Sequence, residues 1–164
     1  MKRILFSLVL TFGAFAQAGD VVISGVAPTG ASIRFSLNYE SQSSSLFCSH
    51  SVLDEGFHLR RYPDVYKKSV TVSVPANGFA ANLPATLSKC DAELTGILMD
   101  VTFAPSQLTG SIHLQMSANN ISETQRVQCE TKTYEGATPF KAVLCDKDIV
   151  VGADGKANVE ITLK

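Results

Sequence analysis

From Val21 onward, apolar residues recur mainly at every second position, the pattern of β-strands that bury one face. The alternation is strongest over residues 32–39, 70–74, 97–103 and 112–116. In the first of these segments, an isoleucine, a phenylalanine, a leucine and a tyrosine are separated by serine, arginine or asparagine. Each segment is therefore predicted to be a strand with one face in the core and one in water.

Near the end of the sequence, residues 148–151 and 158–163 flank an Asp154-Gly155 pair. Asp-Gly between two strand-like runs favours a tight turn, because both residues tolerate positive φ. The sequence therefore predicts that these two runs form a β-hairpin.

Weaker strand candidates at residues 21–26, 80–87 and 126–129 bring the total to eight or nine. No segment shows a helical stripe, and the polar stretch 117–124 is expected to be a connection with at most one short turn. Short strands at this spacing are typical of an all-β sandwich or barrel. We expect a single antiparallel β-sandwich of about eight strands, immunoglobulin-like or transthyretin-like, an architecture that carries many functions.

The first eighteen residues have the pattern of a secretory signal peptide. Lys2 and Arg3 form a basic head, residues 4–15 are almost entirely apolar, and Ala16-Gln17-Ala18 supplies the small residues of a cleavage site. The apolar run is shorter than the roughly 20 residues that span a bilayer as a helix, so no stable membrane insertion is expected after cleavage. The expected organisation is a signal peptide at 1–18 and one domain at 19–164, exported to the periplasm or outside the cell.

The sequence has four cysteines, and an even number in an exported chain favours disulfides. Cys129 and Cys145 are the favoured first pair, because the residues between them include turn formers that could bring two strands together. Cys48 and Cys90 then pair by elimination. Closing loops of these lengths contributes roughly 3 and 4 kcal/mol in the chain-entropy model.

A metal site is the competing interpretation of these cysteines, because Cys48-Ser49-His50 places a thiolate near an imidazole. Zinc sites usually draw on two closely spaced pairs of ligands, and the sequence has no second such pair. The other two histidines, His58 and His113, lie far apart along the chain. We therefore predict neither a metal site nor a cofactor.

Net charge argues against nucleic acid as the partner. Without Lys2 and Arg3 the chain has 12 Lys and Arg against 15 Asp and Glu, a net charge of −3. Proteins whose main task is to neutralise phosphates are usually basic, because electrostatic attraction supplies most of the non-specific affinity for nucleic acid.

The longest part of the chain without clean alternation covers residues 41–68, and a connection of that length inside a compact domain is usually functional or poorly ordered. Within this segment, residues 57–68 combine arginines and lysines with tyrosines and a histidine. Because arginine binds carboxylates or phosphates and stacks on aromatic rings, the expected partner of this segment is a protein or an anionic surface ligand. The alternative is that the tyrosines pack on the sandwich while the cations are solvated and protect an edge strand. The candidate binding residues are Phe57, His58, Arg60, Arg61, Tyr62, Tyr66, Lys67 and Lys68.

Patterns for catalysis are weak. The nucleophile-elbow pattern G-x-S-x-G is absent. Ser111 and His113 would share one face of a strand, but nothing near them in the sequence supplies a third triad member or an oxyanion hole. Carboxylate pairs such as Asp146 and Asp148 more commonly flank turns. No catalytic residue is therefore assigned.

These observations favour a non-enzymatic exported domain that binds a macromolecular partner in a binding, inhibitory or accessory role. One alternative is a small secreted hydrolase or metal-dependent enzyme whose residues converge only in three dimensions. Another is a subunit of a surface assembly, for which residues 158–164 would form an edge strand. The sequence does not indicate an oligomeric state.

Overall fold

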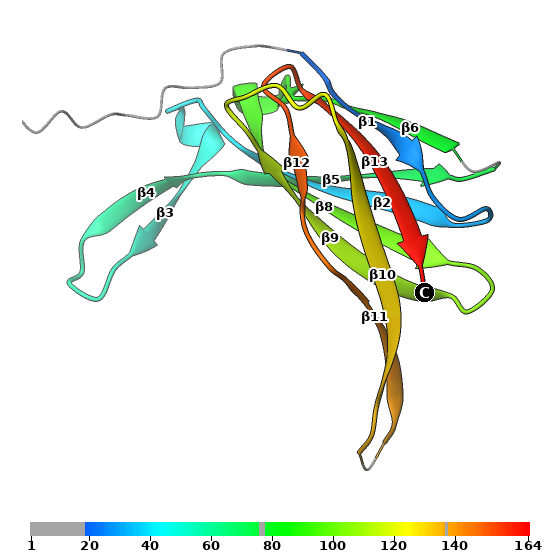
Figure 1. Ribbon diagram of the computed structural model, residues 1–164. Coiled ribbons are helices and arrows are strands. Elements are labelled where there is room, and N and C mark those ends of the chain that lie inside the picture. The colour runs from blue at the N-terminus through cyan, green and yellow to red at the C-terminus, as the bar shows by residue number, and fades with distance from the viewer. Residues whose placement is uncertain (1–18, 76–77, 137) are drawn as a thin grey trace, which may run out of the picture.

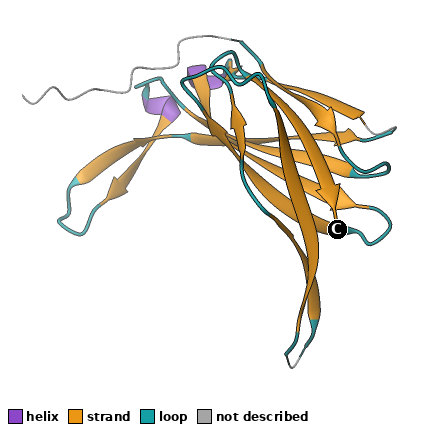
Figure 2. Ribbon diagram, viewed as in Figure 1, coloured by secondary structure: helices purple, strands orange, loops and turns teal. Residues whose placement is uncertain are grey.

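Strands make up almost all of the regular structure in the computed structural model, which describes residues 19–75, 78–136 and 138–164 (Figures 1 and 2). The expected signal peptide, residues 1–18, lies outside the described residues. Two single-turn 3₁₀ helices interrupt the strands, η1 (Leu46–Cys48) and η2 (Lys89–Asp91). The strands are β1 (Val21–Val26), β2 (Ser32–Glu40), β3 (Ser49–Leu53), β4 (Leu59–Pro63), β5 (Val65–Ser73), β6 (Gly78–Leu83), β7 (Thr86–Leu87), β8 (Ala92–Phe103), β9 (Leu108–Met116), β10 (Thr124–Tyr134), β11 (Phe140–Cys145), β12 (Ile149–Val151) and β13 (Lys156–Leu163).

Most of the strands belong to two sheets. The five-stranded sheet has the order β11-β10-β13-β1-β6, and the six-stranded sheet has the order β12-β9-β8-β2-β5 with β7 beside β8. In the described part of the chain, β3 and β4 pair with each other and form a separate two-stranded sheet. Figure 1 shows this hairpin standing apart from the two larger sheets.

The alternation predicted for β2 places one face of that strand in the core. Ile33, Phe35, Leu37 and Tyr39 are at most 1% exposed, and the residues between them face outward. The same core cluster includes side chains from the five-stranded sheet, such as Ile23 on β1. Burying a side chain of this size stabilises the fold by roughly 1.5–3 kcal/mol relative to leaving it exposed. The two sheets thus share one hydrophobic core.

The all-β class is confirmed, but the sheets differ from the expected antiparallel arrangement of about eight strands. Thirteen strands are present in the described residues, because the segments 41–68 and 80–87 contain more strands than expected and residues 140–145 form a strand where none was expected. Three pairings are parallel: β1 with β13, β10 with β13, and β9 with β12. Each of the two larger sheets therefore contains both parallel and antiparallel pairs. The parallel pairs join strands that are not connected by a simple hairpin, because other strands lie between them in the sequence or the chain crosses over between them.

The predicted hairpin near the end of the sequence is wrong, although its turn forms. The Gly152 amide donates to the Lys156 carbonyl oxygen at 2.9 Å, and Gly155 has a φ of 74°. Beyond this turn the strands separate, because β12 joins β9 in the six-stranded sheet while β13 lies between β10 and β1. The segment 158–164 is consequently not the edge strand considered for a surface assembly.

The segment 41–68, expected to be one long connection, contains regular structure. After a loop at residues 41–45 come η1, β3, β4 and the first part of β5. Both faces of β3 and β4 are exposed. Their sequence therefore lacks the alternation that marks a half-buried strand.

Two glycines allow strands to approach where a side chain would not fit. A Cβ on Gly25 would overlap the Val159 carbonyl group on β13, and a Cβ on Gly110 would lie 2.8 Å from Val143 Cγ1 on β11. We expect Gly25→Ala to lower the free energy of unfolding by about 1–3 kcal/mol, because the backbone of β13 must shift. Gly110→Ala should also be destabilising, because the buried Val143 side chain and the disulfide-bonded Cys145 Sγ, 2.9 Å from the added Cβ, have little room to move.

Urea unfolding monitored by circular dichroism would measure these differences, with Gly136→Ala as the control. A Cβ added to Gly136 would have no atom within 4 Å, so this substitution should change stability by less than about 0.5 kcal/mol. Equal stability of Gly25→Ala and the control would contradict the packing described for β1 and β13.

Candidate functional site

A β-hairpin that we term the arm, residues 49–63, projects from the end of the six-stranded sheet (Figure 1). Its second strand, β4, continues into the edge strand β5 with only Asp64 between them. None of its fifteen residues, all of which the structure describes, is buried. The arm therefore presents both of its faces to solvent.

The arm and its base carry most of the large apolar side chains that are exposed in the described residues. Eight of thirteen such side chains lie between Leu46 and Val65. At the tip, Phe57 is 83% exposed, and Leu53 pairs with Leu59 across the hairpin beside it. Exposed apolar side chains gathered in this way are uncommon on a folded domain, so the arm is the first part of the described chain to consider as an interaction site.

Asp54 organises the turn at the tip of the arm. One carboxylate oxygen accepts hydrogen bonds from the backbone amides of Gly56 and His58 at 3.0 and 2.9 Å. The other oxygen forms an ion pair with Arg60 Nε at 2.9 Å. The turn holds Phe57 at a φ of 60°, in the left-handed region that residues other than glycine rarely adopt. The tip thus has a defined conformation that displays the Phe57 ring.

A disulfide and several hydrogen bonds anchor the base of the arm. Cys48, directly before β3, is joined to Cys90 in η2. The Asp64 amide donates to the Cys48 carbonyl oxygen at 3.1 Å, and the Asp64 carbonyl oxygen accepts from the Ser41 amide at 3.0 Å. The Asp64 carboxylate also lies 3.0 Å from His50 Nδ1. An isolated hairpin is at best marginally stable in water, so these links hold the arm in place.

The two arginines of the arm have different surroundings. Arg60 is paired with Asp54, whereas Arg61 has no ion pair within the described residues. Arg61 lines a pocket of about 380 Å³ where the arm meets the six-stranded sheet, which we term the arm pocket. Its other lining residues are Ser41, Gln42, Ser43, Ser44, Ser49, Tyr62 and Pro63.

The remaining candidate binding residues lie on β5, outside the arm. Tyr66 packs against the core, with Lys89 Nζ 4.6 Å from the centre of its ring. Burial, and next the charge of Asp64, raise the pKa of Tyr66. Lys67 and Lys68 are exposed on this edge strand, where charge discourages pairing with other chains. The structure thus brings Phe57 to Tyr62 together on the arm and separates them from the β5 group.

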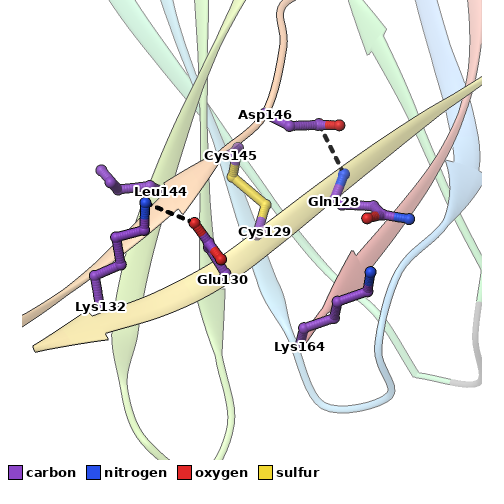
Figure 3. Close-up of a pocket in the computed structure, with 8 residues that line it drawn as sticks. All are labelled: Gln128, Cys129, Glu130, Lys132, Leu144, Cys145, Asp146 and Lys164. Carbon is purple, nitrogen blue, oxygen red and sulfur yellow. Dashed lines mark hydrogen bonds and ion pairs between the residues drawn. A yellow bond between two sulfur atoms is a disulfide. The ribbon is translucent and has the colours of Figure 1, made fainter.

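A second pocket, of about 410 Å³, lies at the base of the β10–β11 hairpin (Figure 3). It is lined by the second disulfide, between Cys129 and Cys145, so both cysteine pairs are those expected from the sequence. Glu130 forms an ion pair with Lys132 at 2.8 Å, and the Asp146 carboxylate accepts a backbone hydrogen bond at 2.9 Å. The acidic groups of this pocket are therefore already paired.

A row of polar side chains crosses three strands on the outer face of the six-stranded sheet. Arg34 Nη2 donates to one Asp100 carboxylate oxygen at 2.9 Å, and the Ser111 hydroxyl donates to the other at 2.7 Å. Burial by itself raises the pKa of Asp100, but the two hydrogen bonds and the charge of Arg34 outweigh it and lower the pKa below its usual value. The Ser111 proton is thus directed to Asp100 and not to His113.

The described ranges contain no group of three or more His, Cys, Asp or Glu side chains placed to hold a metal ion. No family model, curated protein or solved structure matches the chain significantly. In the same ranges no helix is long and apolar enough to cross a membrane. The two disulfides are typical of an oxidising, exported environment.

Sequence reasoning identified the cations of the arm but missed most of its apolar residues, including Val52, Leu53 and Leu59. The available signal was the turn-forming run Asp54-Glu55-Gly56 between two short segments that contain apolar residues, which is a hairpin pattern. That pattern carries little weight without alternation around it.

The Cys48–Cys90 disulfide is expected to control the order of the arm. In Cys48→Ser/Cys90→Ser, trypsin should cleave after Arg60 and Arg61 faster than in the wild type under native conditions, because the base of the arm is released. Cys129→Ser/Cys145→Ser is the matched control, since each disulfide contributes roughly 3–4 kcal/mol to overall stability in the chain-entropy model. Equal acceleration in both variants would mean that the arm opens only with global unfolding.

Asp100→Asn should lower the free energy of unfolding at pH 7 by about 1–2 kcal/mol, because it weakens charge-assisted hydrogen bonds to a partly solvated Arg34. The pKa of Asp100 is lowered by folding, so its stabilisation is present above the unfolded value of about 3.9. The stabilisation disappears as the pH falls through the lower native pKa. Urea unfolding between pH 7 and pH 2 should therefore show the wild type and Asp100→Asn converging at acid pH, and a difference that is constant with pH would contradict this assignment.

Proposed function

We propose that this protein is an exported, non-enzymatic β-sandwich domain that binds another protein through its arm. The observation that carries the proposal is the projecting hairpin, on which Leu53, Phe57 and Leu59 form an exposed apolar tip above a disulfide-anchored base. Interfaces draw most of their affinity from a few large side chains that become buried on binding. The arm supplies such side chains in a fixed position, so less conformational freedom is lost on binding.

The conformation of Phe57 supports a role at the tip beyond folding. Left-handed backbone costs an L-residue roughly 1–2 kcal/mol, a cost that glycine avoids. Because the Phe57 ring is exposed, it adds little burial to compensate. A strained and solvent-exposed aromatic residue is better explained by a contact with a partner than by the stability of the free domain.

Charge on the arm favours a protein over a lipid surface as the partner. Asp54 and Glu55 lie at the tip beside Phe57, and Asp64 lies at the base. An anionic membrane surface would repel these carboxylates, whereas a protein interface accommodates both signs of charge around an apolar centre. The arm combines that apolar centre with flanking acids and arginines.

The wider architecture fits this role. Two sheets around one core, in the manner of immunoglobulin-like or transthyretin-like sandwiches, provide a rigid body from which a loop or hairpin can project. The expected signal peptide and the two disulfides support work in the periplasm or outside the cell. An enzymatic role has less support, because the His50–Asp64 pair lies at the base of the arm, with a half-exposed His50 side chain.

The proposal is tested by capture from the exported protein fraction of the source cells, using the immobilised mature chain. The wild type should retain a specific protein, and Phe57→Ser/Leu59→Ser should reduce its retention by tenfold or more, because about 1.4 kcal/mol of lost contact corresponds to a tenfold change. Phe140→Ser is the matched control, since Phe140 is an exposed aromatic residue on the β10–β11 hairpin.

Thermal unfolding of the variants should match that of the wild type, because the altered side chains are exposed in the free domain. Retention of the same protein by Phe57→Ser/Leu59→Ser at wild-type level would exclude the tip as the binding surface. Concentration-dependent dimerisation that is lost in this variant would instead show that the arm binds a second copy of the chain.

A further inference from the structure

We infer that the arm pocket is a carboxylate-binding site that receives an acidic side chain or a chain terminus of the protein partner. This inference rests on the proposed function, which it deepens by naming the chemistry of the partner. It is carried by the position of Arg61, the one arginine of the arm that has no acidic partner in the described residues. Arg61 lines a pocket in which four of the eight lining residues are serines.

The two neighbouring arginines provide an internal comparison. Arg60 and Arg61 follow each other on β4 and therefore point to opposite faces of the hairpin. Arg60 reaches Asp54 at 2.9 Å and is neutralised within the arm. Arg61 faces Ser51 across the hairpin and lines the arm pocket. One guanidinium is thus used to shape the tip, while the other remains available to a ligand.

Hydroxyl groups beside Arg61 can complete the coordination of an anion. Ser43 Oγ accepts a hydrogen bond from the Ser45 amide at 3.3 Å, which leaves its own proton free to donate. No hydrogen bond involves the Ser44 hydroxyl in the described part of the chain, and that residue also lines the pocket. A guanidinium with adjacent hydroxyl donors is a common arrangement for binding carboxylate oxygens.

The loop that presents these serines is held in place before any ligand arrives. Ser41 Oγ accepts from the Ser43 amide at 3.2 Å and donates to the Cys90 carbonyl oxygen at 3.2 Å. Cys90 is joined to Cys48 at the base of the arm. The serine loop and the strand that carries Arg61 are therefore tied to the same disulfide, which reduces the ordering needed for binding.

The charge of the pocket favours a carboxylate over a phosphate. Arg61 is the only charged residue among the eight that line it. A single guanidinium balances the one negative charge of a carboxylate, whereas sites for phosphate usually combine several cations or backbone amides. A glutamate or aspartate side chain, or a C-terminal carboxylate, also fits a partner that contacts the apolar tip at the same time.

The test uses two short peptides with the ¹⁵N-labelled mature protein. Ac-Gly-Glu-Gly-NH₂ should shift the NMR signals of Arg61 Nε–Hε and of the Ser43 and Ser44 amides, with a dissociation constant of about 1–10 mM. Ac-Gly-Gln-Gly-NH₂, which lacks the charge, should leave these signals unchanged. Ionic strength is matched with sodium chloride, because salt alone screens exposed charges.

Arg61→Gln should abolish the shifts caused by the glutamate peptide, and Arg60→Gln, the matched control, should retain them. Equal shifts with both peptides, shifts that survive in Arg61→Gln, or shifts reproduced by sodium chloride would overturn the assignment. Tighter binding of inorganic phosphate than of the glutamate peptide would assign the site to phosphate and overturn the choice of carboxylate.

Capture experiments separate this inference from the proposed function. Arg61→Gln should reduce retention of the partner by about tenfold, the effect of losing one charge-assisted contact. If Phe57→Ser/Leu59→Ser loses the partner while Arg61→Gln keeps it fully, the arm binds the partner but the carboxylate site fails. If the peptide result holds while the tip variant keeps its partner, the pocket stands and the arm-tip proposal fails.

Discussion

The burial of one face of β2 positions the rest of the molecule, including the arm. Its four inward side chains lie in the core between two antiparallel neighbours, β5 and β8. A shift of one residue in either pairing would move these side chains from the core into water, so the register is strongly fixed. Because β5 is the direct continuation of β4, the same register determines where the arm leaves the sheet. The arm makes no core of its own and depends on this alignment and on the disulfide at its base.

The sequence predicted structure well wherever one face of a strand is buried, because burial alone produces the alternating pattern. It therefore located β2 and β8, and it failed for β3 and β4, in which both faces are exposed. The failed terminal hairpin has a different cause. The Asp154-Gly155 turn is a local preference that was correctly recognised, but the partners of the flanking strands are chosen by distant burial. Ile149 is fully buried in one sheet and Val159 in the other, which separates the two strands.

The candidate site was predictable in composition but not in arrangement. Basic and aromatic residues between Phe57 and Lys68 stand out in an acidic chain, and they mark the correct region. Which arginine is free depends on the cross-strand geometry that brings Asp54 to Arg60, and this is visible only once the hairpin is known. The serine loop lies some twenty residues before Arg61 in the sequence. Its approach to the arm follows from the Asp64–Ser41 hydrogen bond and the Cys48–Cys90 link, two long-range contacts that no local pattern encodes.

The place of β13 in the five-stranded sheet has a consequence for the order of folding. This strand lies between β10 and β1, so residues 156–163 bridge the earliest strand of the described chain and the rest of the sheet. Until they are in place, β1 and β6 have no connection to β10 and β11 within that sheet, and much of the core remains open. Contacts between segments so distant in sequence form slowly, because a long loop must close first. The pairs β1–β6 and β10–β11 can therefore form separately while the chain is being made, but they join into one sheet only after residues 156–163 have been added.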